Sequence, residues 1–181
     1  MVSRDKHKAI FSGDYYFRGS HADKVTRLTS AFGKTNKSLF NRNLDVYLLA
    51  PIVGFLYTRT ADLESSSRTT NVLYDAMSKE LTTLWFNYRL IMLLDKKHEP
   101  DFDKRVDKAF RIYGKPQAVP DEERYEAYVR GGVDILYEKL IEPSNTEEDY
   151  LNNLFDFMEE FENRYGQNTD EIVDLCRLAR S

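Results

Sequence analysis

The residues of this chain with the clearest chemical potential are the basic side chains of its first 44 residues. Aromatic residues lie between them, among them Phe11, Tyr15, Tyr16, Phe17 and Phe32. Because phosphates attract lysine and arginine and because bases stack on aromatic rings, this mixture is typical of a nucleic-acid surface. The alternative is an ordinary solvated face whose aromatic residues lie in the core. Six basic residues are candidates for nucleic-acid binding: Arg18, Lys24, Arg27, Lys34, Lys37 and Arg42.

Charge is distributed unevenly along the sequence. Residues 1–44 carry nine Lys or Arg and three Asp, a balance of +6, whereas residues 145–181 carry ten Asp or Glu and three Arg, a balance of −7. The whole chain has a formal net charge of −4. A basic first segment and an acidic last segment predict two surfaces with different partners. The alternative is that Lys34, Lys37 and Arg42 pair with an acidic helix over residues 146–163, in the same molecule or in a second copy.

No catalytic or metal-binding residue type stands in a recognisable motif. The histidines His7, His21 and His98 are far apart and lack the H-x-x-x-H spacing of a metal site. The single cysteine, Cys176, cannot form an internal disulfide, and its apolar helical face predicts a small core residue. The sequence contains no glycine-rich phosphate loop and no G-x-S-x-G motif. We therefore predict no catalytic residue, no metal site and no cofactor, and we expect most carboxylates to lie on solvated helix faces.

The pair Gly131 and Gly132 interrupts a segment that otherwise has good helical periodicity. Two glycines in a helix cost roughly 2 kcal/mol relative to two alanines. They predict either a break between two helices or a place where another helix or chain approaches to backbone distance. A simple corner between helices is the favoured interpretation.

Residues 45–57 form the most apolar part of the chain. They could span a membrane, lie in the core or contribute to a functional surface. The apolar run over residues 44–57, of 14 residues, contains one carboxylate and is shorter than the roughly 20 residues that span a bilayer. We predict a buried helix that is kinked or restarted at Pro51, with Gly54 at a close approach of another backbone. Leu49 is expected to be buried. A buried strand over residues 45–50 is the main alternative.

Apolar residues recur at helical spacing through most of the remaining chain. A capping box of Ser144 with Glu147, or of Asn145 with Glu148, is expected before one of these segments. Helices are predicted over residues 69–95, 101–113, 121–141 and 146–164, followed by a short helix that starts within 167–171. A short helix is also expected within residues 23–33, and an extended arm or a small strand within residues 7–21.

The fold class predicted from these elements is mainly α. With 181 residues, of which 41% are hydrophobic, the chain is long enough for one domain with its own core. We expect a single-domain helical bundle of about six helices. Residues 1–44 are expected to form a less regular, basic segment, as part of the same domain or as an arm, and residues 45–181 the helical domain. The start of the sequence has no signal-peptide pattern, so a cytoplasmic protein that does not enter a membrane is expected.

Two stretches resemble segments of a known family. "DVYLLAPIVGFLYTRTADLE" (45–64) is similar to the Leu-Leu-Ala-x-x-x-Gly-Phe segment of small accessory proteins of DNA phosphorothioation (Dnd-type) modification and restriction systems. "YEAYVRGGVDILYEKL" (125–140) is similar to their Tyr-Ala-x-Gly-Gly-x-x-x-Leu segment, and Pro51 and Arg130 depart from the pattern. The resemblance implies a bacterial defence-system accessory protein that acts in a complex at DNA, and it carries over no catalytic residue. The matching residues are Leu48, Leu49, Ala50, Gly54, Phe55, Gly131, Gly132 and Leu136.

From these observations we expect a non-catalytic accessory or adaptor subunit of a bacterial anti-phage or DNA-modification complex. Its basic N-terminal face would contact nucleic acid or an acidic partner, and its acidic C-terminal helices would bind a protein subunit. One alternative is a nuclease or nucleotide-processing subunit whose carboxylates converge only in the folded chain. Another is a free-standing DNA-binding regulator with a helical dimer interface, so a second copy of the chain is also a candidate partner.

Overall fold

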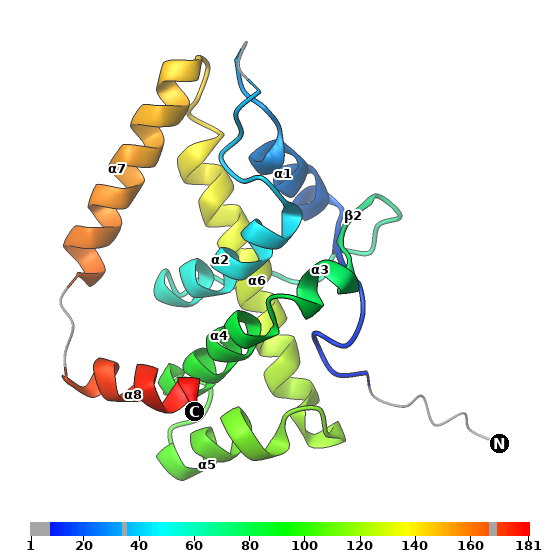
Figure 1. Ribbon diagram of the computed structural model, residues 1–181, viewed down its shortest axis with the longest axis vertical. Helices are drawn as coiled ribbons and strands as arrows, with labels where there is room; N and C mark the ends of the chain where they lie inside the picture. Colours follow the sequence, from blue (N-terminus) through cyan, green and yellow to red (C-terminus); the bar gives the residue numbers. More distant parts are fainter. Residues whose placement is uncertain (1–7, 34–35, 167–169) are drawn as a thin grey trace.

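The helices of the computed structural model account for most of the residues it describes, which are residues 8–33, 36–166 and 170–181. The predicted mainly α class is confirmed (Figure 1). The described part contains eight α-helices: α1 Ser20–Thr29, α2 Asn43–Leu56, α3 Tyr74–Ser78, α4 Leu81–Leu94, α5 Phe102–Asp107, α6 Val119–Leu140, α7 Glu147–Tyr165 and α8 Asp170–Arg180. A π-helical turn, η1 (Lys108–Ile112), continues α5, and a 3-10 turn, η2 (Pro116–Ala118), precedes α6. No helix of the described residues is both long and apolar enough to cross a membrane.

The central contact of the fold is the crossing of α2 over α6 (Figure 1). Glycines on both helices allow the two backbones to touch. A Cβ atom added at Gly132 would meet the Ala50 backbone, and one added at Gly54 would meet the carbonyl of Tyr128. Helix α6 runs without interruption through both of its glycines, so the predicted helix corner is wrong. The alternative of a close backbone approach is confirmed.

Helix α2 also runs through its proline. The predicted helix over residues 45–57 is confirmed in type, and the alternative strand over 45–50 is wrong. Pro51 has no N–H to donate to the carbonyl of Tyr47 in the preceding turn, and one residue further on the buried side chain of Asn87 donates to the carbonyl of Leu48, at 2.7 Å. Leu49 is 38% exposed, so its predicted burial is wrong. The buried face of α2 includes Tyr47, Ala50 and Val53, and Leu49 does not lie on that face.

Residues 69–95 form three elements rather than the one predicted helix. Strand β2 (Thr69–Val72) pairs antiparallel with β1 (Tyr15–Arg18), with Tyr15 opposite Val72, and α3 and α4 follow. Asn43 Nδ2 donates to Thr70 Oγ1 at 3.0 Å and to the Asn71 carbonyl at 2.8 Å, which holds β2 against the start of α2. The β-branched residues at the start of the segment suit a strand. The spacing of apolar residues within the segment carries no information about pairing with a strand more than 50 residues away.

The N-terminal segment packs against the helical body. Strand β1 confirms the small strand expected within residues 7–21, and α1 lies against both α2 and α6. Phe11 has a φ of 64° and places its ring among buried aromatic rings, 5.7 Å from Tyr125 and 6.3 Å from Tyr47. At the other end of the body, the capping box of α7 is Thr146 with Asp149, so both predicted pairs are wrong, by two positions for Ser144 with Glu147 and by one for Asn145 with Glu148.

Candidate functional site

The six basic residues predicted to bind nucleic acid lie on several different elements. Arg18 is exposed in β1, and Arg42 precedes α2, where it pairs with Asp45 at 2.6 Å. Lys37 is exposed between α1 and α2. Lys34 lies outside the described residues. Among the described residues, no contact places Arg18, Lys37 and Arg42 on one shared surface.

Lys24 and Arg27 are the two predicted residues that the structure brings together. Both lie on α1 and approach the ring of Tyr137, with Lys24 Nζ 5.8 Å and Arg27 Cζ 5.5 Å from its centroid. Lys24 Nζ also lies 2.6 Å from Asp134 Oδ1, and Arg27 donates to the Tyr137 hydroxyl at 2.8 Å. These contacts hold α1 against α6, so both cations already stabilise the packing of the two helices.

Behind Lys24, the buried His21 joins two carboxylates. Its Nδ1 lies 3.4 Å from Glu64 Oε1 and its Nε2 lies 3.3 Å from Asp134 Oδ1. Burial alone would raise the pKa of Asp134, but the contacts with His21 and Lys24 outweigh it and lower that pKa. The cluster connects α1, α6 and the irregular segment after α2. Among the described residues, no group of three or more His, Cys, Asp or Glu is placed to hold a metal ion.

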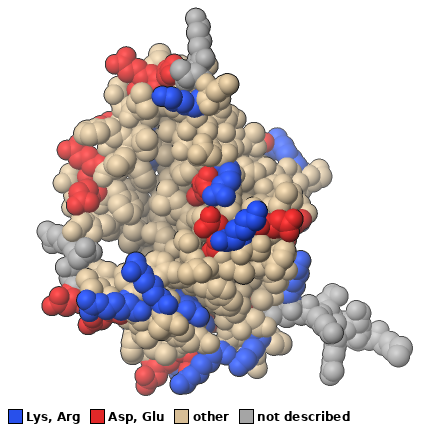
Figure 2. Space-filling view, in the orientation of Figure 1, with Lys and Arg blue, Asp and Glu red and all other residues tan. Residues whose placement is uncertain are grey.

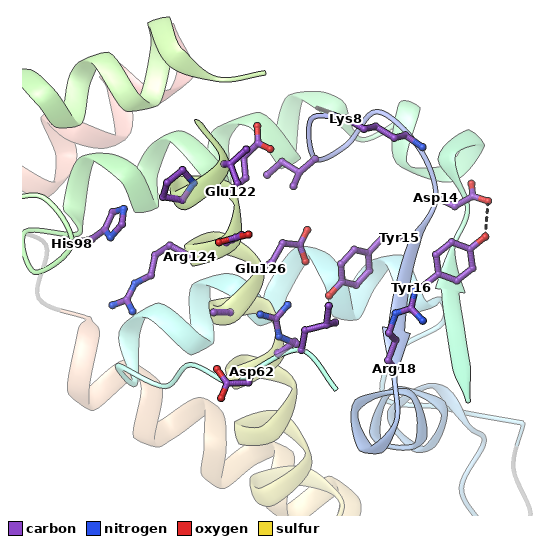
Figure 3. Close-up of a pocket in the computed structure, with 17 residues that line it drawn as sticks. Lys8, Asp14, Tyr15, Tyr16, Arg18, Asp62, His98, Glu122, Arg124 and Glu126 are labelled. Atoms are coloured by element: carbon purple, nitrogen blue, oxygen red, sulfur yellow. Dashed lines mark hydrogen bonds between the residues drawn. The ribbon is translucent and has the colours of Figure 1, made fainter. Parts of the chain in front are cut away.

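A groove of about 760 Å³ lies between β1, the segment around Asp62 and the first half of α6 (Figure 3). His98 and Arg124 lie at one end of the groove in Figure 3, and Tyr16 and Arg18 at the other. Its lining mixes both signs of charge, so it offers no uniformly basic path for a polyanion. The charged residues of this groove are Lys8, Arg18, Arg124, Arg130, Asp14, Asp62, Glu122, Glu123 and Glu126.

Glu126, in the middle of this groove, is its chemically most distinctive residue. Its Oε1 accepts a hydrogen bond from the Tyr47 hydroxyl at 3.0 Å, and no described residue forms a hydrogen bond with its buried Oε2. Burial raises the pKa of Glu126 to about 7, and interactions with Tyr15, Tyr47 and Arg130 oppose that rise. Burial likewise raises the pKa values of Tyr15 and Tyr47. A carboxyl group with such a pKa can accept or donate a proton near neutral pH.

The outer face of α7 carries large apolar side chains that face solvent. Leu151, Phe155 and Met158 recur at steps of four and three, so they form one stripe along the helix. Their exposed fractions are 56%, 67% and 62%. A monomeric protein rarely exposes such a continuous apolar stripe without an interaction that covers it.

The stripe continues into a groove between α7 and the body of the protein. This groove has a volume of about 420 Å³ and is lined almost entirely by apolar residues. Leu49 and Val53 of α2, Leu136 of α6, and Leu154 and Met158 of α7 contribute to it. Figure 2 shows this region as a hollow with few charged side chains, next to acidic residues at the outer edge of α7. The exposed position of Leu49 is explained by this groove.

Polar contacts hold α7 in place beside the groove. Glu160 accepts a hydrogen bond from the Tyr57 hydroxyl at 3.0 Å and pairs with Lys139 at 2.7 Å. The hydroxyl of Tyr165 donates to the carbonyl of Leu56 at 2.8 Å. The helix therefore presents its outer stripe from a fixed position, which lowers the entropic cost of binding.

Sequence reasoning found the apolar residues of α7 but not their exposure. Leu151, Leu154, Phe155, Met158 and Phe161 form one apolar face at helical spacing, but this spacing alone does not show which of them another element covers. The face is wider than the contact with α6 can cover. That width was the one signal in the sequence that could have indicated a binding surface.

No protein-family model, no curated protein and no solved structure matches this chain.

Proposed function

We propose that this protein is a non-catalytic adaptor subunit that binds a partner protein through the outer face of α7 and the adjoining apolar groove. The observation that carries the proposal is the exposed stripe of Leu151, Phe155 and Met158. Aromatic and methionine side chains are enriched at the centres of protein interfaces. The stripe and the groove together offer both a ridge and a recess to a partner helix.

Charge around the stripe specifies the chemistry of this partner. Helix α7 carries seven Asp or Glu and one Arg, and Glu148, Glu159 and Glu162 lie beside the stripe at helical spacing. An amphipathic helix with an apolar ridge and basic flanks would complement this face. A second copy of α7 would instead bring acidic residues close to acidic residues, which disfavours self-association.

The cellular setting that we propose is a bacterial anti-phage or DNA-modification complex. The similarity of residues 45–64 and 125–140 to accessory proteins of Dnd-type systems supports this setting. Within such a complex, the exposed basic residues of the N-terminal segment would contact DNA phosphates. Salt-dependent retention of DNA by the purified chain tests that part, because each phosphate contact adds to the salt slope.

Co-expression with the products of adjacent genes tests the adaptor function. We expect a stable complex with one of these products, and we expect the double variant Phe155→Ser, Met158→Ser to lose it. The matched control is Leu73→Ser with Tyr74→Ser, since these apolar side chains are also exposed but lie at the start of α3. A complex that survives the α7 double variant would contradict the proposal, and so would the absence of any complex. A dimer of the isolated chain that the double variant dissociates would identify a second copy as the occupant.

A second candidate function is proton-transfer catalysis in the groove that contains Glu126. The specific observation that favours it is a carboxyl group with a pKa of about 7 in a cavity large enough for a small substrate. Thermal-shift screening with divalent metal ions and nucleotides tests this function. Stabilisation by one ligand that Glu126→Gln abolishes would support catalysis, and identical responses of both proteins would contradict it.

A further inference from the structure

A second groove, of about 590 Å³, lies between α4 and the C-terminal end of α8. It is separate from the partner surface on α7 and from the groove at Glu126. Two hydroxyl groups, two aromatic rings and two guanidinium groups contribute to its lining, from Thr82, Thr83, Trp85, Phe86, Arg89 and Arg180. The combination of guanidinium and hydroxyl donors suits an oxyanion.

Arg89 is fixed in this groove but is not neutralised there. Its Cζ lies 5.6 Å from the centroid of Trp85 and 4.9 Å from that of Phe110, and its Nη1 donates to the carbonyl of Ala179 at 3.4 Å. The Nε atom of Arg89 is buried and has no hydrogen-bond partner among the residues that the structure describes. A buried donor without an acceptor is destabilising, so the guanidinium group of Arg89 retains unused hydrogen-bonding capacity beside the groove.

Arg180 brings a second guanidinium group to the same groove. Its Cζ lies 5.3 Å from the ring centroid of Phe86. The nearest acidic residues along α8 are engaged elsewhere, because Asp174 pairs with Arg177 at 3.1 Å and Glu171 with Lys96 at 3.2 Å. Within the described residues, neither Arg89 nor Arg180 forms an ion pair with a carboxylate. Figure 2 shows Lys and Arg side chains gathered over this part of the molecule.

We infer that the groove between α4 and α8 binds the phosphate group of a nucleotide. Two guanidinium groups present paired N–H donors that match phosphate oxygens, and stacking on aromatic rings holds Arg89 and Arg180 in position. The hydroxyls of Thr82 and Thr83 add further donors. The volume exceeds that of a phosphate ion, and guanidinium planes and aromatic rings also stack on nucleobases. A free nucleotide and a nucleotide within a nucleic-acid strand both offer phosphate oxygens and a base to this groove.

The chain carries its own reporter for this site, because Trp85 is its single tryptophan. A titration of the full chain at constant ionic strength would follow Trp85 fluorescence with three probes: inorganic phosphate, a 5′-mononucleotide, and a dinucleotide that has only an internal phosphodiester. We expect a saturable change with the mononucleotide or with the dinucleotide, and the stronger of the two identifies the source of the phosphate. No saturable change with any probe would overturn the inference, and so would saturation by inorganic phosphate alone.

Two variants at exposed positions distinguish a specific phosphate-binding site from non-specific electrostatic attraction. Arg180→Gln removes one guanidinium group from the groove and should weaken nucleotide binding by about tenfold or more. Arg177→Gln removes the same charge from the same helix, but Arg177 is paired with Asp174 and does not line the groove. The nucleotide affinity of this variant should therefore match that of the unmodified chain. Because both positions are exposed, both variants should fold. Equal weakening by the two substitutions would overturn the inference.

Discussion

At the scale of single residues, environment rather than residue type decides what a side chain can do. Glu126 is one of many glutamates in the sequence, and its spacing does not distinguish it. Its special property comes from Tyr15 on β1 and Tyr47 on α2, which cover the carboxyl group from elements far away in the chain. No sequence pattern contains that information. The same limit applies to Leu49, whose apolar character predicted burial although its position places it beside an open groove.

The raised pKa of Glu126 predicts a pH-dependent stability. The carboxyl group ionises near 4.5 in the unfolded chain and at about 7 in the folded protein, so between these values the folded state binds more protons. Raising the pH through this window therefore favours unfolding. We expect Glu126→Gln to gain stability relative to the unmodified chain between pH 4.5 and 7, by an amount on the order of 3 kcal/mol.

Urea unfolding at pH 5 and pH 8 measures this difference. Glu123→Gln is the matched control, because Glu123 lines the same groove but is exposed. Its stability should follow that of the unmodified chain at both pH values. Parallel pH profiles for Glu126→Gln and the unmodified chain would show that the carboxyl group is not buried as described.

At the scale of elements, the long helices were predictable and their partners were not. Helices α2, α6 and α7 follow their apolar periodicity and begin or end within a few residues of the predicted bounds. The segment 69–95 was mispredicted because its apolar helical spacing concealed a strand at its start, and the pairing of that strand depends on distant residues. The glycine pair in α6 indicated a special position, but sequence alone favoured a corner over the close crossing that the structure shows.

The crossing of α2 and α6 predicts an unusual effect of alanine in a helix. Alanine normally stabilises a helix relative to glycine by about 1 kcal/mol. At Gly132 the added methyl group would overlap the backbone of Ala50, which cannot move aside as a side chain can. We therefore expect Gly132→Ala to lower the free energy of unfolding by about 1–3 kcal/mol.

Equilibrium unfolding in urea tests this prediction, with Gly13→Ala as the control. A Cβ atom at Gly13 would meet only the end of the Lys8 side chain, which can rotate away. The control should therefore stay within about 0.5 kcal/mol of the unmodified chain. A gain in stability for Gly132→Ala would mean that the two helices do not pack at backbone distance.

At the scale of the whole molecule, the charge imbalance of the sequence is partly resolved by folding. The cations of α1 contact α6 through Asp134 and Tyr137, so they do not all remain available to a polyanion. The acidic residues of α7, by contrast, lie around an apolar stripe that nothing in the described chain covers. The sequence predicted acidic C-terminal helices that bind a protein, and we propose the exposed apolar stripe of α7 as the contact surface. The phosphate groove between α4 and α8 had no sequence signal, because its two arginines are about 90 residues apart.

The outer face of α7 is proposed to bind a basic amphipathic helix. The most direct measurement is a fluorescence-anisotropy titration with a labelled synthetic helix that has a leucine ridge and lysine flanks. The unmodified chain should bind it saturably, more weakly at higher salt because exposed charges are screened, and the Phe155→Ser, Met158→Ser variant should bind it about tenfold or more weakly. The same ridge with glutamate flanks should not bind. Equal affinity of the unmodified chain and the double variant, or equal binding of the two synthetic helices, would contradict the claim.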